Sequence, residues 1–380
     1  MHDNTSEKIA LRSIRTKTKK PVRTGRRMKI AMVTKSLLIG GAEKMFMWLA
    51  TSLANMGHEV IVYTYQPCRI CSLPENILWI KTDLESSGFY SRYRVYRKMI
   101  KEHQPKCSIS FLLEANVLNI LSCMNTPTKS VVCERCDPYK PFYYKLRIMK
   151  PLFRLADGGV FQLEKVKQYY SVIRRPTAVI PNPVFGDVNS VPVRPFCERD
   201  DYIITLGRLD IFQKRQDILI RAFGKFHKRY PHIKLFIYGD GEDKAKIERI
   251  VKTSGLQYSV ILAGVTDKPE DIIRNAKFFV LSSAFEGIPN ALIEAMSTGI
   301  PCISTDCSPG GASLLIVDGV NGSLVPVNDA EALYSGMCRF MEDGDWADRM
   351  GQEGRKIVGR FPEKQIINQW NDYLNCLADN

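Results

Sequence analysis

Residues 277–299 constrain the fold of this chain more than any other stretch. A short apolar run, residues 277–283, is typical of a buried strand. Good helix formers fill residues 291–297, and Gly299 is a natural stop for that helix. Pro289 suits one of the first helical positions. The stretch therefore predicts a strand, a tight turn and a helix, as in a parallel α/β sheet.

Two carboxylates in this unit are placed to bind a polar ligand. Glu286 would lie in the turn at the carboxyl end of the strand, and Glu294 about one turn into the helix. The residues between them include Gly287, Ile288, Pro289 and Asn290. We expect the backbone N–H groups of residues 288–291 to be free, so that the helix dipole favours an anion there. Such a site suits a nucleotide sugar, although the stretch alone fits an ordinary crossover turn equally well.

The length and composition indicate a soluble protein of two domains. A chain of 380 residues with 45% hydrophobic residues can bury a large core. No apolar run is long enough to span a membrane, and the N-terminus lacks the apolar core of a signal peptide. The 11 cysteines form no regular framework. We therefore expect free thiols and a cytoplasmic location.

The net charge of +14 is concentrated in the first half of the chain. Residues 1–27 carry +7, residues 28–182 carry +11, and residues 183–380 carry −4. The first of these segments has few apolar residues and is expected to be a disordered basic tail. A basic half implies an acidic surface or partner, either a membrane or a nucleic acid. No recognisable nucleic-acid module is present, so no nucleic-acid partner is expected.

The first domain is expected over residues 28–183. Residues 30–33 read as a buried strand, Gly40 and Gly41 as a turn, residues 45–56 as a helix, and residues 59–65 as a second strand. This order is the βαβ unit of a doubly wound sheet. The two glycines would let a ligand approach the backbone closely, although a simple tight turn explains them equally well.

Two segments of the first domain, residues 90–98 and 139–154, mix basic and aromatic side chains. Such segments can lie in a membrane interface, with cations on acidic lipid, or they can stack bases. A solvated helix face with inward-facing aromatics is the alternative. The cations expected to meet an anionic membrane, on the inner face of the cell membrane, are Arg92, Arg94, Arg97, Lys98, Lys145, Arg147 and Lys150.

Metal binding is not expected in this chain. Cys68 with Cys71, and Cys133 with Cys136, form two C-x-x-C pairs. A four-cysteine zinc site is conceivable, but the gap between the pairs is far longer than in small zinc modules. The sole Asp-x-Asp, at residues 343–345, reads as a solvated turn. No cofactor or metal is therefore expected.

The second half of the chain repeats the alternation of strands and helices. Two prolines within residues 181–183 indicate a domain junction, and residues 184–200 read as a linker. Residues 201–362 should form a second domain. Its expected strands are residues 202–206, 234–238, 260–262, 277–283 and 300–304. The predicted fold class is α/β, with two doubly wound domains.

Arg208 and Lys214 follow the first strand of the second domain. Ligands of open parallel sheets bind outside the carboxyl ends of the strands. Two cations there, near the helix that follows Glu286, would hold a diphosphate. An exposed arginine and a solvated lysine are the alternative.

Several motifs together resemble a known family of enzymes. They are Phe285-Glu286-Gly287-Ile288-Pro289-Asn290 through Glu294, Gly207-Arg208, Lys214, Gly40-Gly41-Ala42-Glu43, Cys133-Glu134-Arg135-Cys136-Asp137-Pro138, Ile180-Pro181-Asn182-Pro183 and the segment 318–326. The chain resembles the retaining glycosyltransferases of family four, which have the GT-B fold of two Rossmann-like domains facing across a cleft. The resemblance covers nearly everything from Met28 to the end.

The resemblance implies roles for particular residues. Arg208 and Lys214 would grip the donor diphosphate, Glu286 would contact the transferred sugar, and Glu294 would bind the ribose hydroxyls. Glu286, Arg208 and Lys214 are thus the expected catalytic residues. The expected donor-binding set is Gly40, Gly41, Gly207, Arg208, Lys214, Glu286, Gly287, Ile288, Pro289, Asn290 and Glu294. The last helix, residues 363–380, would cross back to the first domain, which would bind the acceptor.

The chain departs from the family pattern at two places. Many relatives carry a histidine beside the acceptor, after the strand that matches residues 109–112, where this chain has Leu113. Members often have a glutamate where Ser313 falls. The acceptor-side candidates that remain are Glu114, Asn116 and Arg135.

The implied activity is transfer of a sugar, with retention, from a UDP-hexose or UDP-N-acetylhexosamine to a lipid-linked or surface-polysaccharide glycan. The Glu-Arg-x-Asp-Pro and Pro-Asn-Ala elements are most similar to enzymes that build bacterial surface polysaccharides, such as lipopolysaccharide or capsule. The alternative is a catalytically inactive GT-B protein that serves as a partner in polysaccharide assembly. An inert protein should lack Arg208, Lys214 or Glu286, and all three are present.

Overall fold

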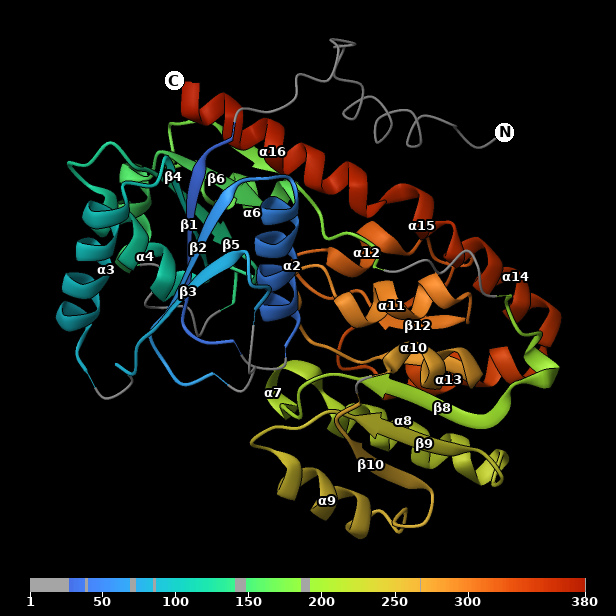
Figure 1. The fold of residues 1–380 in the computed structure, drawn as a ribbon. Coiled ribbons are helices and arrows are strands. Elements are labelled where there is room, and N and C mark those ends of the chain that lie inside the picture. The colour runs from blue at the N-terminus through green and yellow to red at the C-terminus, as the bar shows by residue number, and fades with distance from the viewer. Residues whose placement is uncertain are drawn as a thin grey trace.

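Two parallel sheets organise the chain, one after the other (Figure 1). The structure is a computed structural model, and it describes residues 27–37, 40–68, 73–84, 87–140, 148–185, 192–266 and 268–379. Most of the basic tail, residues 141–147 with Lys145 and Arg147, and Cys71 lie outside these residues. The strand order is β3-β2-β1-β4-β5-β6-β7 in the first sheet and β10-β9-β8-β11-β12-β13 in the second.

The first sheet is built from short apolar strands. They are β1 (Lys29–Thr34), β2 (Glu59–Thr64), β3 (Ile77–Lys81), β4 (Cys107–Phe111), β5 (Lys129–Glu134), β6 (Gly158–Phe161) and β7 (Thr177–Val179). Its helices are α2 (Gly41–Asn55), α3 (Phe89–His103), α4 (Leu113–Cys123), α6 (Glu164–Tyr169) and the 3₁₀ helix η1 (Lys150–Leu155). The central strands are buried along nearly their whole length, as parallel strands covered by helices on both faces must be.

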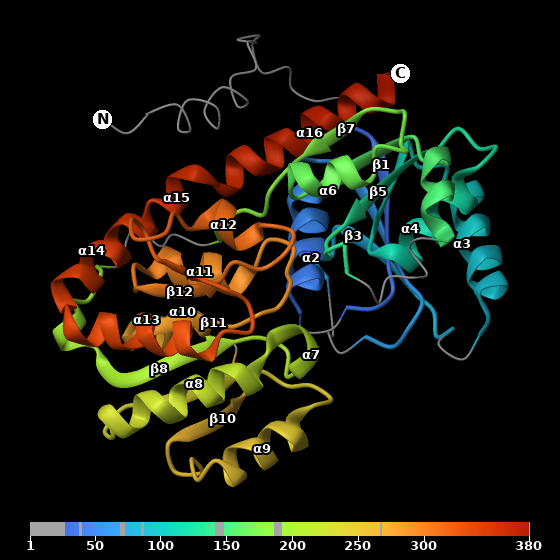
Figure 2. The same ribbon diagram turned by 180° about the vertical axis from the view of Figure 1, so that it is seen from behind.

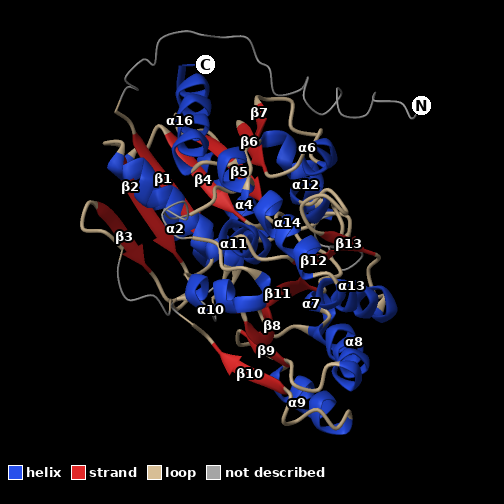
Figure 3. Ribbon diagram, turned by 90° about the vertical axis from the view of Figure 1, so that its right-hand side faces the viewer, coloured by secondary structure: helices blue, strands red, loops and turns tan. Residues whose placement is uncertain are grey.

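The second sheet has the same layered construction (Figure 3). Its strands are β8 (Asp200–Leu206), β9 (Lys234–Tyr238), β10 (Val260–Gly264), β11 (Ala276–Leu281), β12 (Cys302–Thr305) and β13 (Ser323–Val325). The helices are α7 (Ile211–Lys214), α8 (Gln216–Arg229), α9 (Lys244–Thr253), α10 (Pro269–Asn275), α11 (Asn290–Thr298), α12 (Gly311–Leu315), α13 (Ala330–Glu342), α14 (Gly344–Arg355), α15 (Ile357–Arg360) and α16 (Glu363–Asp379). The predicted α/β class with two doubly wound sheets is confirmed.

Several element boundaries differ from the prediction. Helix α2 begins at Gly41 rather than Met45, because the Gly-Gly turn is short and Gly41 already has helical backbone geometry. Strand β4 stops at Phe111, and Leu112 takes a φ of 73° before α4 begins. Strands β3 and β13 were not predicted, because both are short strands at the edges of their sheets and only partly buried.

The segment expected to be a linker is packed where the structure describes it. The N–H of Val184 donates to the carbonyl of Phe361 at 2.9 Å. Phe196, in the 3₁₀ helix η3 (Phe196–Glu198), is buried in the core of the second domain. The chain therefore crosses between the domains in contact with the segment before α16.

Helix α16 returns from the second domain and packs on the first (Figures 1 and 2). Trp370, Leu374 and Leu377 are buried with residues of α2 and of the first sheet. The indole N–H of Trp48 in α2 donates to Glu363 Oε1 at 2.6 Å. The last helix thus ties the two domains together. Within the described ranges, no helix has the length and apolar character needed to cross a bilayer.

Candidate active site

The candidate site lies where the two central strands of the second sheet end. Strands β8 and β11 pair in parallel, so the segments that follow them meet at the same edge of the sheet. Gly207, Arg208 and helix α7 follow β8. Ser282, Ser283 and the turn that contains Glu286 follow β11. The structure thus brings the two cations and the first carboxylate of the predicted set to one edge.

Lys214 and Glu286 form the centre of this site. The Lys214 Nζ lies 2.5 Å from Glu286 Oε1, and the Glu286 side chain is only 9% exposed. The hydroxyl of Ser283 donates to the same carboxylate oxygen at 2.7 Å, and Gln213 Nε2 donates to the other oxygen at 3.3 Å. Glu286 is therefore held in one orientation by three donors before any ligand arrives.

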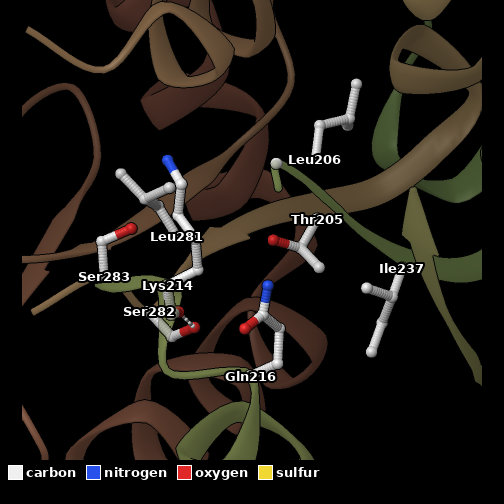
Figure 4. A pocket seen from close by; sticks show the side chains of 9 residues that line it. Thr205, Leu206, Lys214, Gln216, Ile237, Leu281, Ser282 and Ser283 are labelled. Atoms are coloured by element: carbon white, nitrogen blue, oxygen red, sulfur yellow. Dashed lines mark hydrogen bonds between the residues drawn. The ribbon is translucent and has the colours of Figure 1, made fainter. Parts of the chain in front are cut away.

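A small pocket opens beside this pair, at the ends of β8 and β11 (Figure 4). Its lining residues are Thr205, Leu206, Gly207, Lys214, Gln216, Ile237, Leu281, Ser282 and Ser283. Ser282 donates to the carbonyl of Lys214 at 2.8 Å, which fixes α7 against the end of β11. The Lys214 side chain therefore lines this pocket at the ends of the two strands.

Arg208 is fixed at its backbone and free at its side chain. Gln216 Nε2 donates to the Arg208 carbonyl at 2.8 Å, and a Cβ on Gly239 would lie 1.9 Å from the carbonyl oxygen of Gly207. The Arg208 side chain is exposed. Within the part of the chain that the structure describes, its guanidinium makes no hydrogen bond or ion pair. It is therefore available to an anion.

The start of α11 presents fewer free amides than the sequence predicts. The N–H of Ile288 donates to Gln162 Oε1 of the first domain at 3.2 Å, and Pro289 has no N–H. No side chain caps the helix, so the amides of Asn290 and Ala291 have no partner among the described residues. The anion site at this N-terminus reduces to these two amides.

Two residues of α11 contact α2 of the first domain. Glu294 forms an ion pair with Lys44, and Asn290 Nδ2 donates to the carbonyl of Gly41 at 3.0 Å. A Cβ on Gly41 would meet Asn290 Nδ2 at 3.0 Å. The Gly-Gly turn therefore lies against the first turn of α11. Gly40 adjoins this contact.

All three acceptor-side candidates have partners inside the first domain. Glu114 forms an ion pair with Arg92 of α3. Asn116 is fully buried, and it joins β4, α4 and β5 by accepting from Ser110 Oγ at 2.8 Å and from the Cys133 N–H at 3.1 Å. Its predicted acceptor contact is wrong, because every polar atom of its side chain is used inside the fold.

Arg135 is also buried rather than open to an acceptor. Its guanidinium lies 4.4 Å from the ring centroid of Phe111 and 5.7 Å from that of Trp370. Its Nη1 donates to Asn182 Oδ1 at 3.2 Å, whereas Nε and Nη2 have no partner. Burial lowers the pKa of Arg135. In this structure Arg135 is a buried cation near the domain junction, and its acceptor role stays a prediction.

The residues that the sequence reasoning missed are polar side chains at this junction. Asn182 accepts from Gln162 Nε2 at 2.6 Å and donates to Asn290 Oδ1 at 2.5 Å. A Cβ on Gly287 would lie 2.4 Å from both the Arg135 carbonyl and Gln162 Oε1. The Pro-Asn-Pro element could have indicated a fixed polar corner, but nothing in the sequence reveals Gln162 or Lys44 as partners.

The described residues contain no group of three or more histidine, cysteine or acidic side chains that could hold a metal. The Asp-x-Asp motif begins a helix rather than forming the predicted turn: Asp343 caps α14 by accepting from the Trp346 N–H at 2.8 Å, and Asp345 lies in the first turn of that helix. Cys133 is buried in β5.

The second half of the chain matches a known protein family. Residues 191–357 match the family described as "Glycosyl transferases group 1". An uncharacterized glycosyltransferase of Methanocaldococcus jannaschii is 31% identical over 58% of this chain and 61% of its own length. The matched part of the chain thus spans about three fifths of that relative. An alpha-1,4-N-acetyl-D-galactosaminyltransferase of Campylobacter jejuni, whose name specifies a diphosphoundecaprenol-linked substrate, is 25% identical over 90% of this chain and 97% of its own length.

Solved structures share the fold over about nine tenths of the chain. HepE of Anabaena, solved with UDP, has a TM-score of 0.77 and 20% identity, covering 92% of this chain and 100% of that one. The pneumococcal O-GlcNAc transferase GtfA, solved with UDP and GlcNAc, has a TM-score of 0.76 and 13% identity over 93% and 100%. The chain has the predicted GT-B fold.

Proposed function

We propose that the chain is a retaining glycosyltransferase. The proposal is supported by the match of residues 191–357 to the family described as "Glycosyl transferases group 1". Its donor would be a UDP-hexose or UDP-N-acetylhexosamine, and its acceptor a lipid-linked or surface-polysaccharide glycan. One observation carries the proposal. At the carboxyl edge of a parallel sheet, a lysine paired with a buried glutamate meets an arginine that has no partner among the described residues, beside the N-terminus of α11, which no side chain caps there.

The cations of this edge would stabilise the leaving group. Departure of a nucleoside diphosphate from the anomeric carbon builds negative charge on the phosphate oxygens. Arg208, Lys214 and the free amides of Asn290 and Ala291 are preorganised donors for that charge, so they need little rearrangement during the reaction. We propose that these groups act without a metal.

Glu286 would contact the transferred sugar. Its carboxylate is fixed by Lys214, Ser283 and Gln213, and the turn that carries it packs against the first domain through Gly287. Such support holds a reacting group to the accuracy that catalysis needs. Retention with one nearby carboxylate does not require the two-carboxylate covalent route of glycosidases. The leaving phosphate would then take the proton of the acceptor hydroxyl.

UDP is the favoured nucleotide because it is the ligand of the structural neighbours HepE and GtfA. The lipid-linked acceptor is suggested by the substrate that the name of the Campylobacter relative specifies. We further propose that α3 brings the first domain to an anionic membrane. Tyr90 is 68% exposed on this helix, and Arg94 and Lys98 are exposed beside it.

Two of the predicted membrane cations, Arg92 and Arg97, contact other residues of the first domain instead. Arg97 donates to the carbonyl of Met124 at 2.8 Å and so holds the end of α4. Arg92 pairs with Glu114. Neither is a free membrane contact. Lys150 Nζ lies 4.0 Å from the ring centroid of Tyr169. On α3, the proposed membrane surface therefore depends on Arg94 and Lys98.

The decisive experiment is incubation of the protein with a panel of nucleotide sugars, with and without undecaprenyl-diphosphate-linked sugars. Release of UDP and growth of the glycan on the lipid, both lost in Arg208→Ala, would support the proposal. A protein that binds UDP but turns over no donor with any acceptor would be the catalytically inactive partner instead. Equal turnover in the presence of a chelator is expected.

A further inference from the structure

We propose that Lys44 is a positioning residue of the donor site, which acts through Glu294 and couples donor binding to contact between the two domains. The inference rests on the proposed function and on the role that the family resemblance implies for Glu294, which is to bind the ribose hydroxyls of the donor. Lys44 itself is not assigned a contact with the donor. It belongs to the first domain, whereas the carboxylate that it holds belongs to the second.

The contact between the two residues is an ion pair across the domain junction. Lys44 lies in the first turn of α2, and its Nζ donates to Glu294 Oε1 in α11, 250 residues away in the sequence. The two side chains are 39% and 15% exposed, so the carboxylate is the better buried partner. Both views of the ribbon place α2 beside α11 (Figures 1 and 2). Holding this pair requires that the two domains stay together.

The pair leaves half of the carboxylate available. Lys44 occupies Oε1, while Glu294 Oε2 has no hydrogen-bond partner among the residues that the structure describes. An ionised carboxylate offers about four acceptor positions on its two oxygens. Lys44 can therefore fix the orientation of Glu294 and still leave Oε2 to accept from a ribose hydroxyl. Fixing the group in advance lowers the cost of binding.

The ammonium of Lys44 also contacts the segment that crosses between the domains. Its Nζ lies 4.8 Å from the ring centroid of Phe185, and that ring packs edge-on against Trp48 of α2 at 6.1 Å. The preceding residue, Val184, is hydrogen-bonded to Phe361 on the returning segment. Lys44 thus stands where α2, α11 and the crossing segments meet. Any opening of the domains at this point separates it from Glu294.

Other contacts across the junction do not reach the glutamates. Asn290 contacts Gly41, and Lys140 Nζ donates to the carbonyl of Ala284 at 3.3 Å. These contacts bring the domains together, but they place no charge on Glu294. Because Lys44 alone among them pairs with a carboxylate assigned to the donor, it is the residue through which closure can change donor affinity. By linkage, a bound donor must then favour the closed arrangement to the same extent.

The test compares Lys44→Met, Lys44→Arg, Glu294→Gln and the double variant Lys44→Met/Glu294→Gln with the unmodified protein. Methionine keeps the apolar stem against Phe185 and removes the ammonium. Lys225→Met is the matched control, because Lys225 pairs with Glu331 on the surface of the second domain, away from the junction. Binding of UDP is measured by calorimetry, and donor KM and kcat by steady-state kinetics.

We expect Lys44→Met to weaken UDP binding and raise the donor KM roughly tenfold, the effect of losing one charged hydrogen bond, with little change in kcat. Lys44→Arg should restore most of the affinity. The double variant should bind UDP no more weakly than Glu294→Gln, because the two residues act as one unit. Small-angle scattering of the unliganded protein should show a larger radius of gyration for Lys44→Met than for Lys225→Met.

Three results would overturn the inference. Unchanged UDP affinity with a lower melting temperature in Lys44→Met would give Lys44 a structural role only. Tighter UDP binding in Lys44→Met would mean that Lys44 competes with the donor for Glu294. Additive losses in the double variant would show that Lys44 does not act through Glu294. If the unmodified protein binds no nucleotide, both the proposed function and this inference are wrong. That result is distinct from the other three, which leave the proposed function intact.

Discussion

Lys214 and Glu286 form an ion pair, and this pairing determines how substitution of either residue should affect stability. The pair is largely buried, so removing one partner leaves the other without compensation. Arg208 is exposed, and no such loss attends its removal. The proposed mechanism gives Arg208 and Lys214 the same role, but substituting them should affect the stability of the protein differently.

We predict that Arg208→Ala and Lys214→Ala each cost about 2–4 kcal/mol of transition-state stabilisation, measured as kcat/KM. Lys214→Ala should also lower the melting temperature, because it leaves Glu286 buried without its cation, at a cost of about 1–3 kcal/mol. Arg208→Ala should melt like the unmodified protein. Near-normal turnover in both variants would contradict the proposed grip on the diphosphate.

The two glutamates should fail in different ways. Glu294 is taken to bind the ribose before and during the reaction alike, so Glu294→Gln should mainly raise the donor KM. Glu286 should matter more as the bond from sugar to phosphate breaks, so Glu286→Gln should mainly lower kcat. Steady-state kinetics at saturating acceptor, with thermal melts as the folding control, measure both. The opposite pattern would reverse the assignment.

Glu134 should make the stability of the protein depend on pH. Burial raises the pKa of Glu134 from 4.5 to about 7, although amides of Arg135 and Cys136 donate to its carboxylate. The folded state therefore keeps a proton that the unfolded state releases between these two values. The free energy of unfolding should fall as the pH rises from about 4.5 through 7, by up to about 3 kcal/mol.

Glu134→Gln should remove that slope, because the amide stays neutral and can still accept from both backbone N–H groups. The measurement is the melting temperature of both proteins from pH 5 to 8. The variant should gain stability relative to the unmodified protein as the pH rises. Parallel curves would show that Glu134 does not hold a proton in the folded state.

At the scale of elements, α3 separates structural cations from exposed ones. Arg92 and Arg97 tie the helix to α4, while Arg94 and Lys98 lie on its solvent side near the exposed ring of Tyr90. Lys98 is also within 3.6 Å of Glu102, one turn along, but that pair is exposed and weak. The helix therefore offers a narrow basic strip instead of the broad surface that the sequence suggested.

We predict that the protein sediments with liposomes that contain acidic lipid and that salt weakens this binding. Arg94→Glu should reduce it, since each cation near such a surface contributes about 1 kcal/mol. Arg221→Glu, which changes the charge equally on α8 of the second domain, is the control. Equal sedimentation with neutral liposomes would argue against an electrostatic contact through α3.

At the scale of the whole molecule, the junction between the domains places the catalytic turn. Ile288 and Gly287 of the second domain touch Gln162 and Arg135 of the first. The position of Glu286 is therefore set by both domains together. A change that wedges the domains apart at this point should reduce activity even when each domain still folds.

Gly287→Ala tests this arrangement. The added Cβ would lie 2.4 Å from the Arg135 carbonyl, closer than atoms tolerate, and relieving the overlap should cost about 1–3 kcal/mol. We expect the loss of transition-state stabilisation, calculated from kcat/KM, to exceed the loss in the free energy of unfolding. Gly359→Ala is the matched control, because its Cβ would meet nothing within 4 Å. Equal activity of the two variants would show that the turn does not depend on this contact.

The sequence by itself determined the central strands of the second domain and the sheet edge at which its candidate site residues meet. Apolar runs such as β11 must be buried on both faces, and the turn with two glutamates and a Pro-Asn helix start is a local pattern. Strand ends in a parallel sheet meet at one edge, so Arg208, Lys214 and Glu286 could be placed together from their order alone. The resemblance to a family, and with it the GT-B fold, rested on the same local motifs.

Only the tertiary structure decided which polar groups pair across the junction. Gln162 and Ile288 are 126 residues apart, and Lys44 and Glu294 are 250 apart, so no local pattern carries their contact. Burial decided in the same way that the side chains of Asn116 and Arg135 lie inside the fold rather than at its surface. The sequence gives the polarity of each side chain. Its exposure and its partner depend on which elements pack over it, and that packing depends on the whole chain.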